Sequence, residues 1–260
     1  MSLRTLGLNS TFKGLFTKPA DVSKTVSTIL DFKSQPQQSL DNILIRSDKE
    51  IGGYSTANFS VENGTGHFHG YLNLDLPKDN PEVTRSGYAM FRTKDQKESW
   101  LSGSNYWDWS NYQSLALRVK GDTRKYLVNI QANTPLVTDL FQHRLFLDTP
   151  GEWETVVIPL NDFVMTNWGV IQDGSEINKL EVKTIGIGLL DKQYGPFSLQ
   201  IDWIKVMTGT EVENLARNAR IHKITSQENE IRQLEEQEQH EQHGAAINGG
   251  KYDDPKSTVF

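Results

Sequence analysis

Two histidines separated by one residue form the sharpest candidate for reactive chemistry in this chain. Side chains two positions apart on a strand point to the same face, so His67 and His69 can both reach one metal ion. A metal site on such a sheet also needs a carboxylate a few residues later and a third histidine on a later strand. Asn73 stands where the carboxylate is expected, and His143 is the only histidine in the later predicted strands. We therefore predict neither a metal nor another cofactor, and interpret the pair as a polar strand face.

Tryptophan rings that stack on sugars are the second candidate chemistry. The chain contains six tryptophans: Trp100, Trp107, Trp109, Trp153, Trp168 and Trp203. Trp203 ends an alternating apolar run that begins at Phe197, which predicts that it packs in the core. Trp107 and Trp109 precede a predicted strand and are placed to form a rim. Because most tryptophans pack with their N–H satisfied, a carbohydrate-binding β-sandwich module is the alternative to a protein-binding function.

Motifs of common catalytic sites are absent from the sequence. The chain has no cysteine, which excludes disulfides, thiolate metal sites and a cysteine nucleophile. It also lacks the G-x-S-x-G, Walker and G-x-G-x-x-G patterns. The net charge of −6 argues against nucleic acid as a partner, and no apolar run approaches the roughly 18–20 residues of a membrane span. We predict a non-catalytic protein, with a metal-dependent enzyme of the cupin type as a third alternative.

A period of two dominates the sequence from about residue 40 to 207. Apolar and polar residues alternate in the segments 68–76, 115–119, 126–130, 185–189 and 197–203, as expected of strands buried on one face. Turn signals such as Asn63-Gly64 separate these segments, and Gly121-Asp122 has the composition of a tight hairpin turn. Strands without helical periods between them predict an all-β, antiparallel sandwich or jelly roll of about eight or nine strands.

The two ends of the chain differ in composition from residues 35–209, which we take as one β-sandwich domain. Residues 1–20 carry Arg4, Lys13 and Lys18 and no acidic residue. Such a start is typical of a mitochondrial presequence or flexible N-terminus, placed at 1–34, with an ordinary surface helix as the alternative. Residues 210–243 are rich in helix formers and predict a charged C-terminal helix. The composition of residues 244–260 predicts a disordered tail.

Motifs spread over residues 47–206 resemble the complex I intermediate-associated protein 30 family in order and spacing. Residues 47–55, S-D-K-E-I-G-G-Y-S, are similar to the family's opening S-D-x-x-x-G-G-x-S signature. Residues 115–122 resemble its L-x-L-R-V-R-G-D strand and turn, and residues 195–202 resemble its closing strand. The chain departs from the family pattern at Trp168, where arginine is usual, and at Leu160, where phenylalanine is common.

The resemblance implies a galactose-binding-like jelly-roll β-sandwich that serves as a non-catalytic assembly factor, or chaperone, of mitochondrial respiratory complex I. It implies binding to membrane-arm subunits and assembly intermediates, and to other complex I assembly factors. It also implies a place in the mitochondrial matrix, peripherally associated with the inner membrane.

Most signature positions are predicted to build the scaffold, because glycine and proline act first on the backbone. The signature residues are Asp48, Gly52, Gly53, Ser55, Gly87, Trp109, Arg118, Gly121, Asp122, Trp153, Pro159, Phe163, Gly169, Gly195, Phe197 and Asp202. Aromatic anchors are expected at the centre of a protein interface. The candidate interface residues are Tyr106, Trp107, Trp109 and Trp168, with the C-terminal helix as a second contact.

Overall fold

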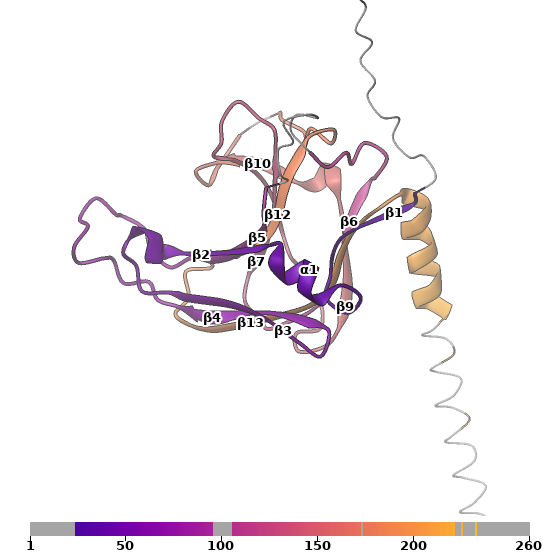
Figure 1. Cartoon of the computed structure of the whole chain (residues 1–260), viewed down its shortest axis with the longest axis horizontal. Coiled ribbons are helices and arrows are strands. Elements are labelled where there is room, and N and C mark those ends of the chain that lie inside the picture. Colours follow the sequence, from indigo (N-terminus) through magenta and orange to yellow (C-terminus); the bar gives the residue numbers. More distant parts are fainter. Residues whose placement is uncertain (1–23, 96–105, 173, 222–224, 226–231, 233–260) are drawn as a thin grey trace, which may run out of the picture. The chain divides into compact units, whose positions relative to one another are not determined.

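Two antiparallel sheets form a β-sandwich, which Figure 1 shows as separate layers. The computed structural model describes residues 24–95, 106–172, 174–221, 225 and 232. The first sheet has the order β3 (Thr56–Glu62), β4 (Thr65–Leu72), β13 (Gly195–Met207), β6 (Ser114–Gly121) and β9 (Glu154–Pro159), with β1 (Val26–Asp31) also paired to β13. The second has the order β11 (Val170–Ile171), β10 (Val164–Asn167), β8 (Asp139–Arg144), β7 (Tyr126–Ala132), β12 (Val182–Leu189), β5 (Ala89–Thr93) and β2 (Ile43–Ser47). The predicted all-β sandwich is confirmed.

The sheets contain six and seven strands, more than the eight or nine that the sequence predicts. Strands as short as β11, which has two residues, are too brief to show an alternating pattern. Among the described residues, short helical segments connect strands at α1 (Pro36–Asp41), η1 (Asp48–Ile51) and η2 (Leu160–Asp162).

The core lies between the sheets, where each strand turns its alternate apolar side chains inward. Phe68 of β4 contacts Phe197 of β13 and Phe91 of the opposite sheet, with ring centroids 4.9 and 5.1 Å apart. All three rings are buried. Full burial of a side chain of this size contributes about 1.5–3 kcal/mol, so the alternating pattern supplies the main stabilising term.

β13 is the spine of the first sheet because three strands pair with it. Its first half pairs with β4, its second half pairs with β1, and β6 runs along the other side. The ladder to β6 slips between Ile201 and Trp203, which leaves Asp202 as the extra residue of a bulge. The bulge places Ile204 in the core and leaves Trp203 half-buried, with the ammonium of Lys205 4.6 Å from its ring centroid. The prediction that Trp203 packs in the core is therefore wrong.

Gly121 and Asp122 do not form the predicted hairpin turn. The chain leaves β6 in the first sheet and enters β7 in the second, so this turn crosses between the layers. Asp122 holds the crossing: Oδ1 accepts from the N–H of Arg124 at 2.9 Å, and Oδ2 accepts from the N–H of Ser198 at 2.7 Å. A glycine followed by an aspartate suits both kinds of turn, so composition alone could not separate them.

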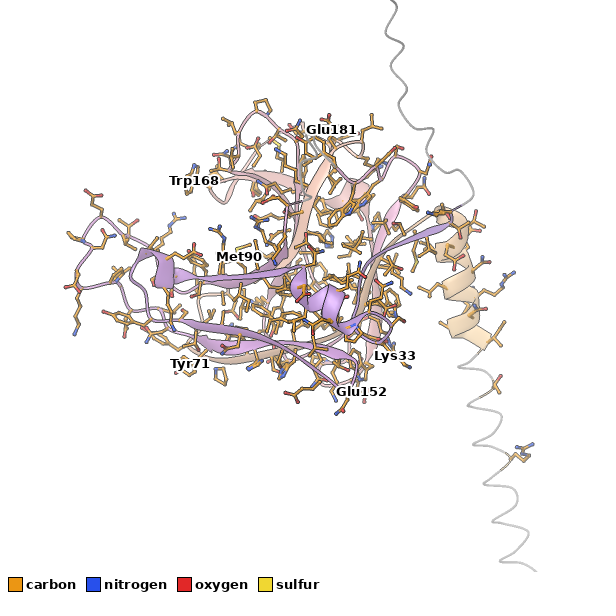
Figure 2. The ribbon with its side chains drawn as sticks, viewed as in Figure 1. Lys33, Tyr71, Met90, Glu152, Trp168 and Glu181 are labelled. Atoms are coloured by element: carbon orange, nitrogen blue, oxygen red, sulfur yellow. The ribbon has the colours of Figure 1, made fainter. Side chains whose placement is uncertain are left out.

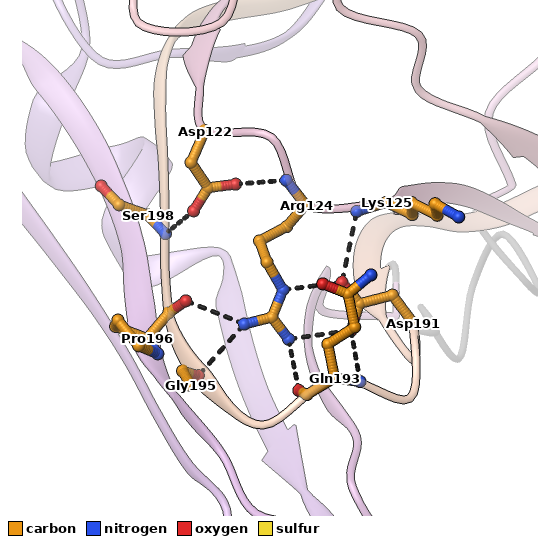
Figure 3. A network of polar contacts seen from close by, with 8 residues as sticks. All are labelled: Asp122, Arg124, Lys125, Asp191, Gln193, Gly195, Pro196 and Ser198. Atoms are coloured by element: carbon orange, nitrogen blue, oxygen red, sulfur yellow. Dashed lines mark hydrogen bonds and ion pairs between the residues drawn. The ribbon is translucent and has the colours of Figure 1, made fainter.

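Arg124 joins this crossing to a second crossing, the one between β12 and β13 (Figure 3). Its Nε and Nη2 donate to the two carboxylate oxygens of Asp191 at 2.6 and 2.8 Å. Nη1 donates to the carbonyls of Gly195 and Pro196 at 3.1 and 2.8 Å, and Nη2 also donates to the carbonyl of Gln193 at 2.8 Å. The two charged side chains are only 8% and 0% exposed, so this bidentate pair is shielded from water.

The chain after residue 209 forms a second compact unit. Residues 210–221 of this unit are helical, as are residues 225 and 232, which confirms a C-terminal helix. Residues 1–23, most of 222–243 and all of 244–260 lie outside the described residues, so the predicted boundaries at both ends stay predictions. Within the described residues, no helix has the length and apolar character needed to span a membrane.

Replacing Arg124 by alanine is expected to lower the free energy of unfolding by about 3–5 kcal/mol, because Asp191 would stay buried without its partner. Urea unfolding of the wild type and the variant measures this difference. Arg46→Ala, which removes an exposed ion pair with Glu50, is the matched control and should cost less than about 1 kcal/mol. Equal losses for the two variants would mean that the Arg124–Asp191 pair stabilises the fold no more than an exposed ion pair does.

The same pair predicts how stability depends on pH. Burial alone would raise the pKa of Asp191, but the hydrogen bond and charge of Arg124 outweigh burial and lower that pKa. A carboxyl group with a lowered folded-state pKa stabilises the fold above its unfolded pKa of about 4, and this contribution is lost as pH falls through the folded-state value. The stability difference between the wild type and Asp191→Asn should therefore shrink below about pH 4 in a pH series of urea unfolding. A difference that stays constant into acid would contradict this assignment.

Candidate functional site

One end of the second sheet gathers the most exposed apolar side chains. They lie in the turn after β7, in the β10–β11 hairpin including strand β11, and in the turn before β12. We call this surface the apolar loop end; its residues are Leu136, Val137, Trp168, Val170, Ile171 and Leu180. Five of the six are 61–80% exposed, more than any other large apolar side chain that the structure describes. Figure 2 shows Trp168 and Glu181 on one side of the sandwich and Glu152 on the opposite side. Exposed apolar surface of this kind marks an interaction site.

Hydrogen bonds hold the three turns beside one another. Asn167 Nδ2 donates to Thr138 Oγ1 and to Asp139 Oδ1, both at 2.8 Å, which fixes the β10–β11 hairpin to the turn after β7. The N–H of Asn133 donates to the carbonyl of Glu181 at 2.8 Å, and its Nδ2 donates to Glu181 Oε2 at 3.1 Å. These bonds fix the turn after β7 to the turn before β12. The apolar side chains are therefore carried on an ordered base.

Trp168 projects from the two-residue turn of the β10–β11 hairpin. Asn167 pairs with Val170, and the two residues between them have φ angles of 51° at Trp168 and 76° at Gly169. Two positive φ values in succession are typical of a type I′ turn, which suits glycine and asparagine and strains a bulky residue. Trp168 is nevertheless placed there and is 79% exposed. Strain kept at an exposed aromatic residue points to a function for that residue.

The turns of the apolar loop end carry little charge. Segments 132–138 and 166–172 contain no Asp, Glu, Lys or Arg. The third turn, before β12, contains the exposed Glu176 together with Lys179 and Glu181, and the Glu181 carboxylate accepts hydrogen bonds from the side-chain amides of Asn133 and Asn178. The tips of the first two turns can therefore enter an apolar environment without removing water from a carboxylate.

The structure separates the four aromatic residues predicted for an interface. Trp109 is 1% exposed and stacks on Trp107 with ring centroids 5.9 Å apart. Trp107 bridges to the start of β12 and packs against the core, while Tyr106 is half-buried with the ammonium of Lys183 5.8 Å from its ring. The prediction of Trp109 as an interface residue is wrong, because its segment lies alongside the start of β12 and the indole points inward. Trp168 is the one fully exposed member of the set.

At the other end of the sandwich, a buried carboxylate organises the opening signature. Asp48 is 0% exposed, and its Oδ1 accepts from the N–H of Ser55 at 2.8 Å. Its Oδ2 accepts from the hydroxyls of Ser55 and Ser86 at 2.8 Å and from the N–H of Gly87 at 2.7 Å. Hydrogen bonds to an ionised carboxylate are stronger than hydrogen bonds between neutral groups. The carboxylate therefore acts as a structural joint, as expected of a group that caps backbone N–H groups.

Two glycines allow the chain to wrap closely around Asp48. Gly52 has φ +90°, and it ends η1 in a conformation that favours glycine. The N–H of Gly53 donates to the Asp48 carbonyl at 2.7 Å, and a Cβ at Gly53 would lie 2.4 Å from Asp48 Cγ. The Ser55 hydroxyl also bonds to the backbone of Asn73. The signature spacing thus places one acid, two glycines and one serine where the joint requires them.

The remaining signature residues lie in strands and turns across the sandwich. Phe163 and Phe197 are buried, Arg118 of β6 donates to Thr155 of β9 at 3.4 Å, and Pro159 ends β9. Gly121, Asp122 and Gly195 lie at the crossings between sheets, Asp202 lies in the bulge, Trp153 precedes β9 and Gly169 completes the Trp168 turn. These positions are distributed over the fold and do not converge on one pocket-like cluster of reactive groups.

Residues 30–201, more than half of the chain, match the protein family described as complex I intermediate-associated protein 30. The chain belongs to this family. A relative from Neurospora crassa, named complex I intermediate-associated protein 30, mitochondrial, is 37% identical over 193 residues, which cover 65% of this chain and 69% of the relative. The proteins of that name from Mus musculus and Drosophila melanogaster are 32% and 30% identical and are covered over 54% and 61% of their length. The chain therefore spans little more than half of these two animal proteins.

Solved carbohydrate-binding modules have a distantly similar structure. A family 11 module from Clostridium thermocellum, in complex with a mixed-linked tetrasaccharide, is 14% identical with a TM-score of 0.46, over 70% of this chain and 95% of the module. A family 30 module of a cellulosomal cellulase is 13% identical with a TM-score of 0.37, over 61% and 92%. Likeness at this level concerns the fold and carries no statement about a ligand.

In this member of the complex I intermediate-associated protein 30 family, the histidine pair lies on the outer face of β4. The rings of His67 and His69 are 4.3 Å apart, and His67 Nε2 is 2.8 Å from Ser198 Oγ. Burial, followed by the nearby charge of His69, lowers the pKa of His67. Among the residues that the structure describes, no group of three or more metal-ligating side chains comes together. The absence of a metal stays a prediction.

Most of the apolar loop end escaped the sequence analysis. Leu136 and Val137 follow a proline, and Val170 and Ile171 follow a glycine, so both pairs lie inside segments with turn composition. Turns are normally polar, and an apolar pair in a turn is the signal that would have found them. Trp168 was identified only because exposed aromatic residues serve as anchors.

Replacing Asp48 by asparagine is expected to lower the free energy of unfolding by about 3 kcal/mol, because the amide nitrogen would face the N–H of Gly87. Asp41→Asn, at an exposed carboxylate that accepts a hydrogen bond from Gln37, is the control and should stay within about 0.5 kcal/mol of the wild type. Chemical unfolding of the three proteins measures both values. A neutral Asp48→Asn variant would show that the signature carboxylate is not a structural joint.

Proposed function

We propose that this chain is a non-catalytic assembly factor of mitochondrial respiratory complex I. It binds intermediates of the membrane arm, together with other assembly factors, from the matrix side of the inner membrane. The observation that carries the proposal is the family match over residues 30–201, with relatives named as intermediate-associated and mitochondrial. The basic, acid-free residues 1–20 support delivery to the matrix by a presequence within 1–34.

The apolar loop end supplies the surface for this function. Three of its side chains are largely exposed: Trp168 at 79%, Val137 at 80% and Ile171 at 66%. Burying a large apolar side chain contributes about 1.5–3 kcal/mol, and tryptophan is enriched among the residues that dominate binding energy. Three such side chains on an ordered base therefore make a favourable contribution to binding. The membrane arm, which is built within the inner membrane, offers the apolar environment that these side chains fit.

A binding role also fits the buried charged groups. Asp48 and the pair of Arg124 and Asp191 are saturated by internal hydrogen bonds, so they suit scaffold functions. The sequence carries none of the common nucleophile or phosphate-binding motifs. These observations support a protein that acts by holding other molecules.

Carbohydrate binding is supported less well. A sugar platform needs neighbouring exposed rings, and of the tryptophans that the structure describes only Trp168 is exposed. Trp109 is buried, and Trp107, Trp153 and Trp203 are partly covered. Isothermal titration against a glycan panel separates the two functions, because saturable heat with any glycan would favour the module.

The double substitution Val137→Ser and Trp168→Ser is expected to lower the yield of co-purified membrane-arm intermediates at least about tenfold, since two exposed anchors are lost. The measurement is affinity purification of the tagged chain from mitochondria, with the intermediates quantified by mass spectrometry. Leu76→Ser, at a residue that is 49% exposed and lies away from the apolar loop end, is the control. The proposed surface would be refuted by an undiminished yield from the double variant, or by an equal loss from the control.

A further inference from the structure

We propose that the apolar loop end inserts its tips into the boundary between headgroups and acyl chains of a lipid bilayer. The inference deepens the proposed function and rests on it only for the identity of the membrane. The five most exposed large apolar side chains of the described residues all lie at this end, on two turns and on the β10–β11 hairpin. Apolar side chains that project in this way can each enter the fluid acyl region of a lipid bilayer.

The composition of the tips favours lipid. Insertion of a charged side chain is costly, and segments 132–138 and 166–172 contain no Asp, Glu, Lys or Arg. Tryptophan prefers the membrane–water interface, where its ring is buried and its N–H stays near water. Trp168, at the tip of its hairpin, is flanked by Val170 and Ile171, which extend the apolar surface. This combination of one indole and aliphatic neighbours is that of an interfacial anchor.

The base of the tips is polar and fixed, which sets a limit to insertion. Asn167 is bonded to Thr138 and Asp139, and Thr166 Oγ1 donates to Gln142 Oε1 at 2.8 Å. The strained φ of +51° at Trp168 is kept by this framework, so the direction in which the side chain leaves the backbone is set before any contact is made. A preformed tip loses little conformational entropy when it binds.

The sparse charge around the tips predicts which lipids are needed. The flanking cations are Lys179 and Lys183, and the latter lies over the ring of Tyr106. Two lysines do not form the cluster of four to eight basic residues that reads anionic headgroups. Binding should therefore occur on zwitterionic phosphatidylcholine and should depend little on salt.

The test is flotation of the purified full chain with phosphatidylcholine vesicles at 0.1 and 0.5 M salt, combined with quenching of tryptophan fluorescence by brominated lipid. The wild type should float at both salt concentrations and show quenching. Trp168→Ser should lose the quenched component and bind at least about tenfold more weakly, and Val170→Ser with Ile171→Ser should weaken binding similarly while Trp168 remains. Leu76→Ser should behave as the wild type.

Three results would overturn the inference: no flotation with phosphatidylcholine, flotation only on anionic vesicles and lost at 0.5 M salt, or unchanged binding of the Trp168→Ser variant. The second result would assign binding to basic segments such as residues 1–20. If vesicles are not bound while the Val137 and Trp168 variant still loses complex I intermediates, the apolar loop end contacts protein, and the proposed function stands without the lipid inference.

Discussion

Two buried aspartates hold together four of the segments of chain that pass from one sheet to the other. Asp48 joins the crossing from β2 to β3 with the segment that leads from β4 to β5, and Asp191 joins the β12–β13 crossing with the β6–β7 crossing through Arg124. The register aligns Ser47, Ala89, Leu189 and Tyr126 across the second sheet, so these four crossings lie at one end. A crossing buries backbone groups that no ladder can satisfy, and a shielded carboxylate satisfies several at once.

We call the end that holds these four crossings the closed end. The other end of the second sheet has turns of a different, more apolar composition. There, three connections join strands within the second sheet, from β7 to β8, β10 to β11 and β11 to β12, while those from β1 to β2 and from β5 to β6 pass between the sheets. Turns within one sheet need only their own hydrogen bonds, so their tips can carry apolar side chains at a small cost to folding. The arrangement gives the protein a rigid, polar-clamped end and an ordered, apolar end, which suits a factor that positions other molecules without transforming them.

The sequence was sufficient for the features that depend on period and on local turn chemistry. Alternation in segments such as 197–203 predicted the sandwich, and the spacing of Asp48, Gly52, Gly53 and Ser55 indicated a capped turn. The failures came from tertiary context. A single-residue bulge at Asp202 re-aimed Trp203, the path along β12 buried Trp109, and the turn at Gly121 crossed between sheets. None of these depends on the residue types alone, and the grouping of Leu136, Trp168 and Leu180 depends on strand order, which one sequence does not encode locally.

The central claim is that the apolar loop end, and not the closed end, faces the membrane in which complex I is assembled. A photo-crosslinking residue placed at position 168, and in a second protein at the exposed Glu152, whose neighbour Gly151 donates to the carbonyl of Gly121 at the β6–β7 crossing, tests it most directly in intact mitochondria. The account predicts crosslinks to membrane-arm subunits or to lipid from position 168 and few from position 152. Crosslinks to these components from position 152 alone would contradict it.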